Sequence, residues 1–150
     1  MLEIRILSVG KLKEKYLSSA QENLLTEISK RHKVRLVEIK DEKTIDGAGT
    51  KEEERVRNIE GQRILSAIRE KGRVIVLDVS GKMVSSDYWL KKIRESDEEN
   101  ALLYLIIGGS LGISMDVLKL SDERVSFSRM TYPHQLFRIM LLHEIAAASK

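Results

Sequence analysis

The apolar residues of this chain follow two spacings, one typical of strands and one typical of helices. Compact apolar runs at 2–9, 34–39, 74–79 and 101–107, and a shorter one from Val125, are typical of strands. The runs at 74–79 and 101–107 are nearly uninterrupted, as in parallel strands that are covered on both faces. The pattern therefore predicts five strands.

Between these runs the apolar residues recur every three or four positions, which predicts amphipathic helices. The predicted helices span residues 13–32, 50–71, 86 to beyond 93, 114–120 and 134–148. Thr50 with Glu53 is typical of a capping box, and Ser86 of a helix cap. Gly61 in the middle of the second helix costs about 1 kcal/mol relative to Ala, so it indicates close packing there.

Strands that alternate with helices predict an α/β protein with a mostly parallel sheet flanked by helices. At 150 residues, the length predicts one domain that spans 1–150. In open sheets of this kind ligands bind outside the carboxyl ends of the strands. Three connections therefore compete for a site, at 80–85, 108–114 and 127–134, and 40–50 is the longest remaining loop.

Composition narrows the function classes. The chain has no cysteine, which excludes disulfides and thiolate sites and fits a reducing cytoplasm. No uncharged run approaches the length of a membrane span, so we expect a soluble cytoplasmic protein that does not contact a membrane. The formal net charge of +3 permits a nucleic acid partner without requiring one.

Candidate chemistry gathers at 125–138, where the only proline, Pro133, separates a strand from the last helix. His134 and Arg138 are four residues apart and so share one helical face, beside a loop rich in Ser and Thr. This combination favours a small polar ligand. The three histidines lack the spacing of a metal site, so no metal is predicted.

The glycine cluster at 107–112, IIGGSLG, follows a strand but is not a GxGxxG fingerprint, and SGKMVSS at 80–86 lacks the spacing of a phosphate loop. Each is either a ligand loop or a plain tight turn. The last helix is apolar at nearly every angle around its axis. It is either a deeply buried core helix or, as we favour, a helix that a second subunit covers in a homodimer.

Five motifs in order resemble those of the ribosomal large subunit methyltransferase H family, along nearly the whole chain. They are VGKLKEKY at 9–16, EGQRIL at 60–65, LDVSGKMVSS at 77–86, IGGSLG at 107–112 and SFSRMTYPHQLFR at 126–138. The family belongs to the SPOUT methyltransferases. The resemblance implies an α/β fold whose C-terminal part forms a trefoil knot.

The resemblance also implies transfer of a methyl group from S-adenosylmethionine to N3 of a pseudouridine in 23S rRNA of the ribosome, by a homodimer and without a metal. The family's cofactor contacts fall on Leu77, Gly108, Phe127, Ser128, Arg129, Met130, Thr131 and Tyr132. Family members usually continue into a basic tail implicated in holding the target base, whereas these residues end at AAASK. Either Arg129, His134 and Arg138 face the substrate and take over that role, as we expect, or the chain has lost part of the activity.

Two other functions stay open at this point. A non-enzymatic RNA-binding module could retain the fold, and cofactor binding would separate it from the enzyme. A nucleotide-binding enzyme of the Rossmann type is disfavoured, because its glycine fingerprint is missing.

Overall fold

The structure is a computed structural model that describes residues 1–44, 47 and 49–150, with the side chain of His134 left out. Strands and helices alternate along the described chain. They are β1 (Glu3–Val9), α1 (Lys15–Ser29), β2 (Lys33–Ile39), α2 (Thr50–Ala67), β3 (Arg73–Met83), α3 (Ser86–Glu98), β4 (Leu102–Ile107), α4 (Met115–Leu120), β5 (Glu123–Ser126) and α5 (His134–Ala148). The loop predicted at 40–50 lies partly outside the described residues.

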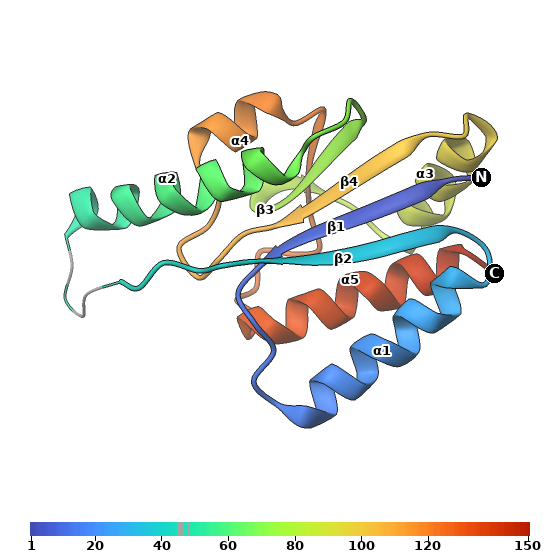
Figure 1. The fold of residues 1–150 in the computed structure, drawn as a ribbon, viewed down its shortest axis with the longest axis horizontal. Helices are drawn as coiled ribbons and strands as arrows, with labels where there is room; N and C mark the ends of the chain where they lie inside the picture. The colour runs from blue at the N-terminus through green and yellow to red at the C-terminus, as the bar shows by residue number, and fades with distance from the viewer. Residues whose placement is uncertain (45–46, 48) are drawn as a thin grey trace.

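The five strands form one sheet in the order β2-β1-β4-β3-β5, and every neighbouring pair is parallel (Figure 1). This confirms the predicted α/β fold with a mostly parallel sheet. Because all strands run in one direction, the segments that follow β1, β2, β3 and β4 leave the sheet at the same edge. We call this edge the carboxyl edge.

Helices cover both faces of the sheet, and each strand contributes apolar side chains to both. In β1, Ile4 and Ile6 pack with residues of α1, α3 and α5, while Leu7 and Val9 pack with residues of α2 and α4. Figure 1 shows α2 and α4 on one side of the sheet and α1 and α5 on the other. Two covered faces explain the nearly uninterrupted apolar runs.

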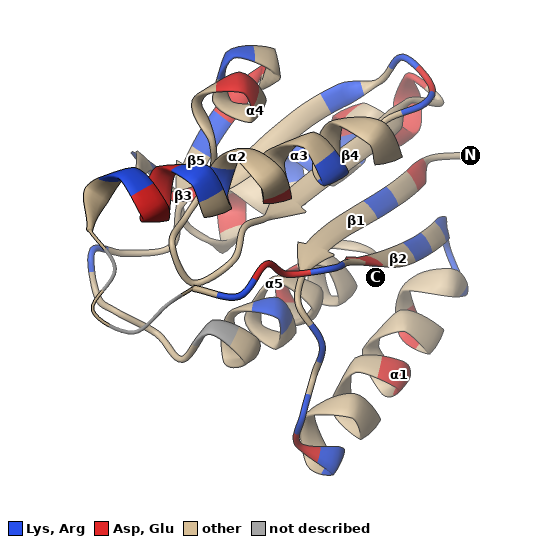
Figure 2. Ribbon diagram, turned by 60° about the vertical axis from the view of Figure 1, so that its left-hand side comes forward, with Lys and Arg blue, Asp and Glu red and all other residues tan. Residues whose placement is uncertain are grey.

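Charged residues, in contrast, alternate in sign along the first half of α2 (Figure 2).

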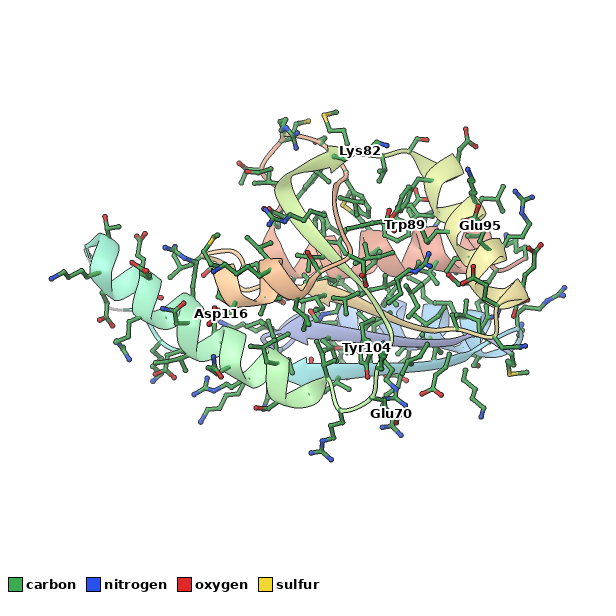
Figure 3. The ribbon with its side chains drawn as sticks, turned by 90° about the horizontal axis from the view of Figure 1, so that it is seen from above. Glu70, Lys82, Trp89, Glu95, Tyr104 and Asp116 are labelled. Carbon is green, nitrogen blue, oxygen red and sulfur yellow. The ribbon has the colours of Figure 1, made fainter. Side chains whose placement is uncertain are left out.

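Strand β3 is longer than predicted, and the expected loop at 80–85 is wrong. Lys82 and Met83 pair with Val125 and Ser126 of β5, after an irregularity in the register. The backbones of β3 and β5 can approach this closely because residue 81 is glycine. A Cβ there would lie 2.7 Å from the backbone of β5. Figure 3 shows Lys82 at the far end of this extension. Only the residues nearest Leu77 therefore remain to form a site at the carboxyl edge.

Two predicted helix caps are also wrong. Thr50 is already part of α2, and the carbonyl of Gly49 before it accepts a hydrogen bond from the Glu53 backbone at 3.1 Å. The described helix start contains no side-chain cap. In α3 the residue before the helix is Ser85 and not Ser86. In both cases the error is one residue.

Candidate functional site

A cavity of about 470 Å³ opens at the carboxyl edge, where three segments far apart in the sequence meet. Its volume is within the range of sites for small organic ligands, roughly 300–1,000 Å³. Three groups of residues line it, together with Phe137 of α5: 77–79 of β3, where pairing with β5 is interrupted, 107–113 at and after the end of β4, and residues of the 126–132 loop. The topological rule for parallel sheets therefore locates this cavity correctly.

Most of the residues predicted to bind a cofactor lie together in this cavity. The lining includes Leu77, Gly108, Ser128, Met130, Thr131 and Tyr132. Phe127 and Arg129 are not among the lining residues. The Phe127 ring instead stacks on Phe137 at 4.9 Å between ring centroids and meets the edge of Trp89 at 6.2 Å. Phe127 thus holds the 126–132 loop in place through these ring contacts, without lining the cavity.

Short hydrogen bonds within the 126–132 loop hold its shape. The Ser126 hydroxyl donates to the carbonyl of Ser128 at 2.8 Å, and the hydroxyls of Ser128 and Tyr132 are 2.8 Å apart. The Met130 backbone N–H donates to the Ser128 hydroxyl at 3.0 Å. The loop is therefore ordered by its own side chains, so binding a ligand there requires less ordering of the loop.

The glycine loop after β4 is tightly closed. The Gly112 N–H donates to the Gly109 carbonyl at 3.0 Å, and Gly112 has a φ of +90°. A Cβ on Gly108 would lie 2.5 Å from the Ile113 side chain and 2.9 Å from the Gly112 carbonyl oxygen. A Cβ on Gly109 would lie 2.7 Å from a carboxylate oxygen of Glu60. A side chain at 108 would therefore displace the loop backbone, and one at 109 would displace the Glu60 side chain.

Two acidic residues near the cavity were missed from the sequence. Asp78 follows Leu77 directly, lines the cavity and is half-buried. Glu60 of α2 is 4% exposed, adjoins Gly109 and accepts a hydrogen bond from the Glu42 backbone at 3.0 Å. The place of Asp78 near the end of the apolar run at 74–79 could have revealed it. No periodicity indicates that Glu60, on a helix, lies against a loop nearly fifty residues later in the chain.

Arg138 lies inside the protein rather than facing a substrate. Its side chain is 2% exposed. Its guanidinium donates to the Ser8 hydroxyl at 2.9 Å, the Gly10 carbonyl at 2.9 Å and the Glu38 carboxylate at 2.8 Å. A further bond to Gln21 spans 3.3 Å. The side chain of Arg138 therefore does not lie where we expected a substrate contact. It joins α5 to β1, β2 and α1 instead.

The other two residues expected to face the substrate lie near the cavity. Arg129 is exposed and donates through Nη1 to the carbonyl of Val79, a cavity-lining residue. His134 begins α5, next to the 126–132 loop, but its side chain lies outside the described part of the structure. Among the described residues no three His, Asp or Glu side chains converge as metal ligands would. None of the described helices is long and apolar enough to cross a bilayer.

The clearest acid–base cluster lies away from the cavity, between α3 and β5. The Tyr88 hydroxyl donates to Glu123 at 2.9 Å, and Lys92 pairs with the same carboxylate at 2.6 Å. Burial raises the pKa of Tyr88, and the hydrogen bond to Glu123 acts in the same direction. For Glu123 burial acts to raise the pKa, but the bonds from Lys92 and Tyr88 outweigh it and lower the pKa. The cluster joins two elements and does not face the site.

Comparison with known proteins agrees with the resemblance. The family described as predicted SPOUT methyltransferase matches residues 2–148. The ribosomal RNA large subunit methyltransferase H of Clostridium botulinum is 47% identical over 148 residues, covering 98% of this chain and 93% of the relative. The protein of that name from Clostridium kluyveri is 44% identical over 147 residues, covering 96% and 91%.

A solved structure shares the fold at low sequence identity. The crystal structure of a probable methyltransferase from Bordetella pertussis Tohama I has a TM-score of 0.58 and 11% identity, and covers 98% of this chain and 94% of that one. At such identity the likeness concerns the fold alone. The match over residues 2–148 and the close relatives go further: the chain belongs to the SPOUT methyltransferase family, with the ribosomal RNA large subunit methyltransferase H proteins.

Proposed function

We propose that residues 1–150 act as one S-adenosylmethionine-dependent methyltransferase unit that modifies N3 of a pseudouridine in 23S rRNA in the cytoplasm. The observation that carries this proposal is the cavity at the carboxyl edge, where residues 77–79 of β3, the loop after β4 and the 126–132 loop meet in a chain of this family. The names of the relatives support ribosomal RNA as the substrate.

The cavity residues fit S-adenosylmethionine. Leu77, Ile107 and Ile113 supply apolar walls that suit an adenine ring, and the glycine loop leaves backbone groups accessible. Hydroxyls of Ser128 and Thr131 can hydrogen-bond the polar parts of the cofactor. No metal is needed to complete this donor set. When bound, the cofactor supplies a methyl group on a positively charged sulfur, which is strongly electrophilic.

The chain's own residues then bind and orient the reactants. The half-buried carboxylate of Asp78 favours a positive charge in the cavity, because opposite charges attract strongly where water is scarce. The hydrogen-bonded 126–132 loop holds the cofactor in a fixed orientation, which lowers the entropic cost of reaching the reactive geometry. We assign the substrate side to Arg129, which is exposed beside the cavity, and to His134 at the start of α5.

A homodimer through α5 forms part of the proposal. The chain covers much of α5 itself, since Leu141, Leu142 and Ile145 are fully buried against the sheet and neighbouring helices. Ile139 and Met140, however, line a second cavity of about 640 Å³ and are only half-buried. This partly exposed apolar strip supports a second copy of the chain as its cover.

Cofactor binding separates this proposal from an RNA-binding module that has kept only the fold. In a calorimetric titration, the protein should bind S-adenosylmethionine with one site per chain, and addition of a chelator should leave the affinity unchanged. Absence of binding, in protein that is folded by circular dichroism, would reject the enzyme and favour the module.

A further inference from the structure

The segment from Lys11 to Tyr16, which connects β1 to α1 and includes the first two residues of α1, is anchored next to the start of α5. The Lys13 backbone N–H donates to the Gln135 side chain at 2.9 Å. Before it, Gly10 donates to the Ile39 carbonyl at 2.8 Å. Figure 1 shows this segment passing the beginning of α5 on its way to α1. Gln135 belongs to the first turn of α5, which also contains the cavity-lining Phe137, so the segment and the cavity adjoin the same end of this helix.

The segment carries the positive excess of this part of the carboxyl edge. Lys11, Lys13 and Lys15 are exposed against the single acid Glu14, which leaves a charge of +2 for 11–15. After the neighbouring strand β2, two lysines at 40 and 43 are matched by two acids at 41 and 42. Figure 2 shows basic residues along the connection from β1 to α1.

The lysines on either side of Leu12 are free to meet a partner. Leu12 is half-buried between Lys11 and Lys13, which are both exposed. Leu12 therefore anchors the segment, while the lysines on either side of it face solvent. No ion pair within the described residues includes Lys11, Lys13 or Lys15. Their charges are available to a partner.

Tyr16 adds an aromatic surface to the same segment. Its side chain is 70% exposed, whereas the other six aromatic side chains, Tyr88, Trp89, Tyr104, Phe127, Tyr132 and Phe137, are buried or half-buried. An exposed aromatic ring beside lysines is the combination that binds single-stranded nucleic acid, because bases stack on the ring while phosphates pair with the cations. Neither feature alone would indicate RNA.

We infer that residues 11–16 form an RNA-binding surface of this enzyme, in which the three lysines contact phosphates and Tyr16 stacks on an unpaired base. This inference rests on the proposed function, since it names the surface by which the RNA substrate is held beside the cofactor cavity. The surface holds RNA whose base is modified elsewhere and does not take part in methyl transfer.

The test uses a fluorescently labelled RNA hairpin from the large-subunit rRNA, with a pseudouridine in its loop. A variant with Lys11, Lys13 and Lys15 all changed to Gln should bind this RNA roughly 100-fold more weakly at 0.1 M salt, since each phosphate contact contributes a factor of about five relative to 1 M. The slope of log affinity against log salt should fall by about 2. Tyr16→Ala should weaken binding about five- to 150-fold, and Tyr16→Phe should restore it.

A matched control removes the same charge elsewhere. Lys33, Lys71 and Lys119 are exposed and lie at the start of β2, before β3 and in α4. Changing all three to Gln should lower the slope of log affinity against log salt by less than half as much as the change at Lys11, Lys13 and Lys15. Calorimetry with S-adenosylmethionine accompanies each variant, because residues 11–16 do not line the cavity and cofactor affinity should stay unchanged.

The outcomes separate this inference from the proposed function. If the wild type transfers methyl groups but the 11–15 variant and the control bind RNA alike, residues 11–16 are not an RNA-binding surface. The proposed function is then unaffected. If the wild type binds no S-adenosylmethionine while the 11–15 variant still loses RNA affinity, the surface stands and the proposed function fails.

Discussion

Replacing Gly61 by Ala should destabilise the protein, although Ala is the better helix former. A Cβ at Gly61 would lie 2.2 Å from the Ser114 hydroxyl and 2.8 Å from the Ser114 Cβ. Ser114 is the N-cap of α4 and accepts a hydrogen bond from Val117. The sequence-based expectation of close packing at Gly61 is thereby confirmed.

The magnitude follows from three contributions. The helix gains about 1 kcal/mol from Ala in place of Gly. Overpacking costs about 1–3 kcal/mol, and losing the Ser114 cap costs about 1 kcal/mol. The free energy of unfolding should therefore fall by about 1–3 kcal/mol, which for a chain of this size lowers Tm by roughly 3–10 °C.

Urea unfolding measures this change, and a double variant tests its cause. Combining Gly61→Ala with Ser114→Gly removes the colliding atoms, and Gly at an N-cap costs only a few tenths of a kcal/mol. The double variant should return to within about 1 kcal/mol of the wild type, which reveals a favourable coupling between the two sites. A Gly61→Ala protein at least as stable as the wild type would refute the reasoning.

Four further predictions follow from named contacts. Arg138→Met should lower the free energy of unfolding by roughly 2–4 kcal/mol, because several hydrogen bonds of a buried guanidinium are lost; urea unfolding within 0.5 kcal/mol of wild type would contradict this. Gly108→Val should weaken S-adenosylmethionine binding at least about tenfold in calorimetry, because the loop backbone must move; equal affinity would remove Gly108 from the site. Ile139→Asp should convert a dimer to monomers in sedimentation without unfolding the chain, whereas a wild type that is monomeric at micromolar concentration would reject the dimer. Burial lowers the pKa of His32 below its ordinary 6.5, so stability should be full above about pH 6.5 and decline as the pH falls, because the unfolded chain takes up the proton first. His32→Gln should flatten that decline in urea unfolding, and an unchanged pH profile would contradict the assignment.

Local sequence patterns predicted most helices and strands well, but they did not predict which strands lie next to each other in the sheet. The last helix was placed at 134–148, as observed, and the strand runs at 34–39 and 101–107 each fall within one residue of the observed bounds. The spacing of apolar residues shows which side chains of a segment are buried. It carries no information about strand order, so the place of β3 between β4 and β5 could not be read from it. The trefoil knot implied by the resemblance stays a prediction.

Errors in the site arise where partners are distant in sequence. Spacing put Arg138 on one face of a helix, but only the fold shows that this face meets Glu38, which lies 100 residues earlier. Residues 80–83 resemble a loop because Ser and Gly are typical of turns, yet pairing with β5 extends the strand. The cavity itself was predictable, because parallel strands bring their carboxyl ends together whatever their order.

Methyl transfer tests the central claim most directly. Purified protein would be incubated with S-adenosylmethionine labelled on its methyl group and with ribosomes whose large-subunit RNA lacks the modification. The RNA would then be digested and the labelled nucleoside identified by mass spectrometry. We predict label on one pseudouridine of 23S rRNA, at N3, without added metal. Folded protein that leaves every RNA nucleoside unlabelled, or that labels a base other than a pseudouridine, would contradict it.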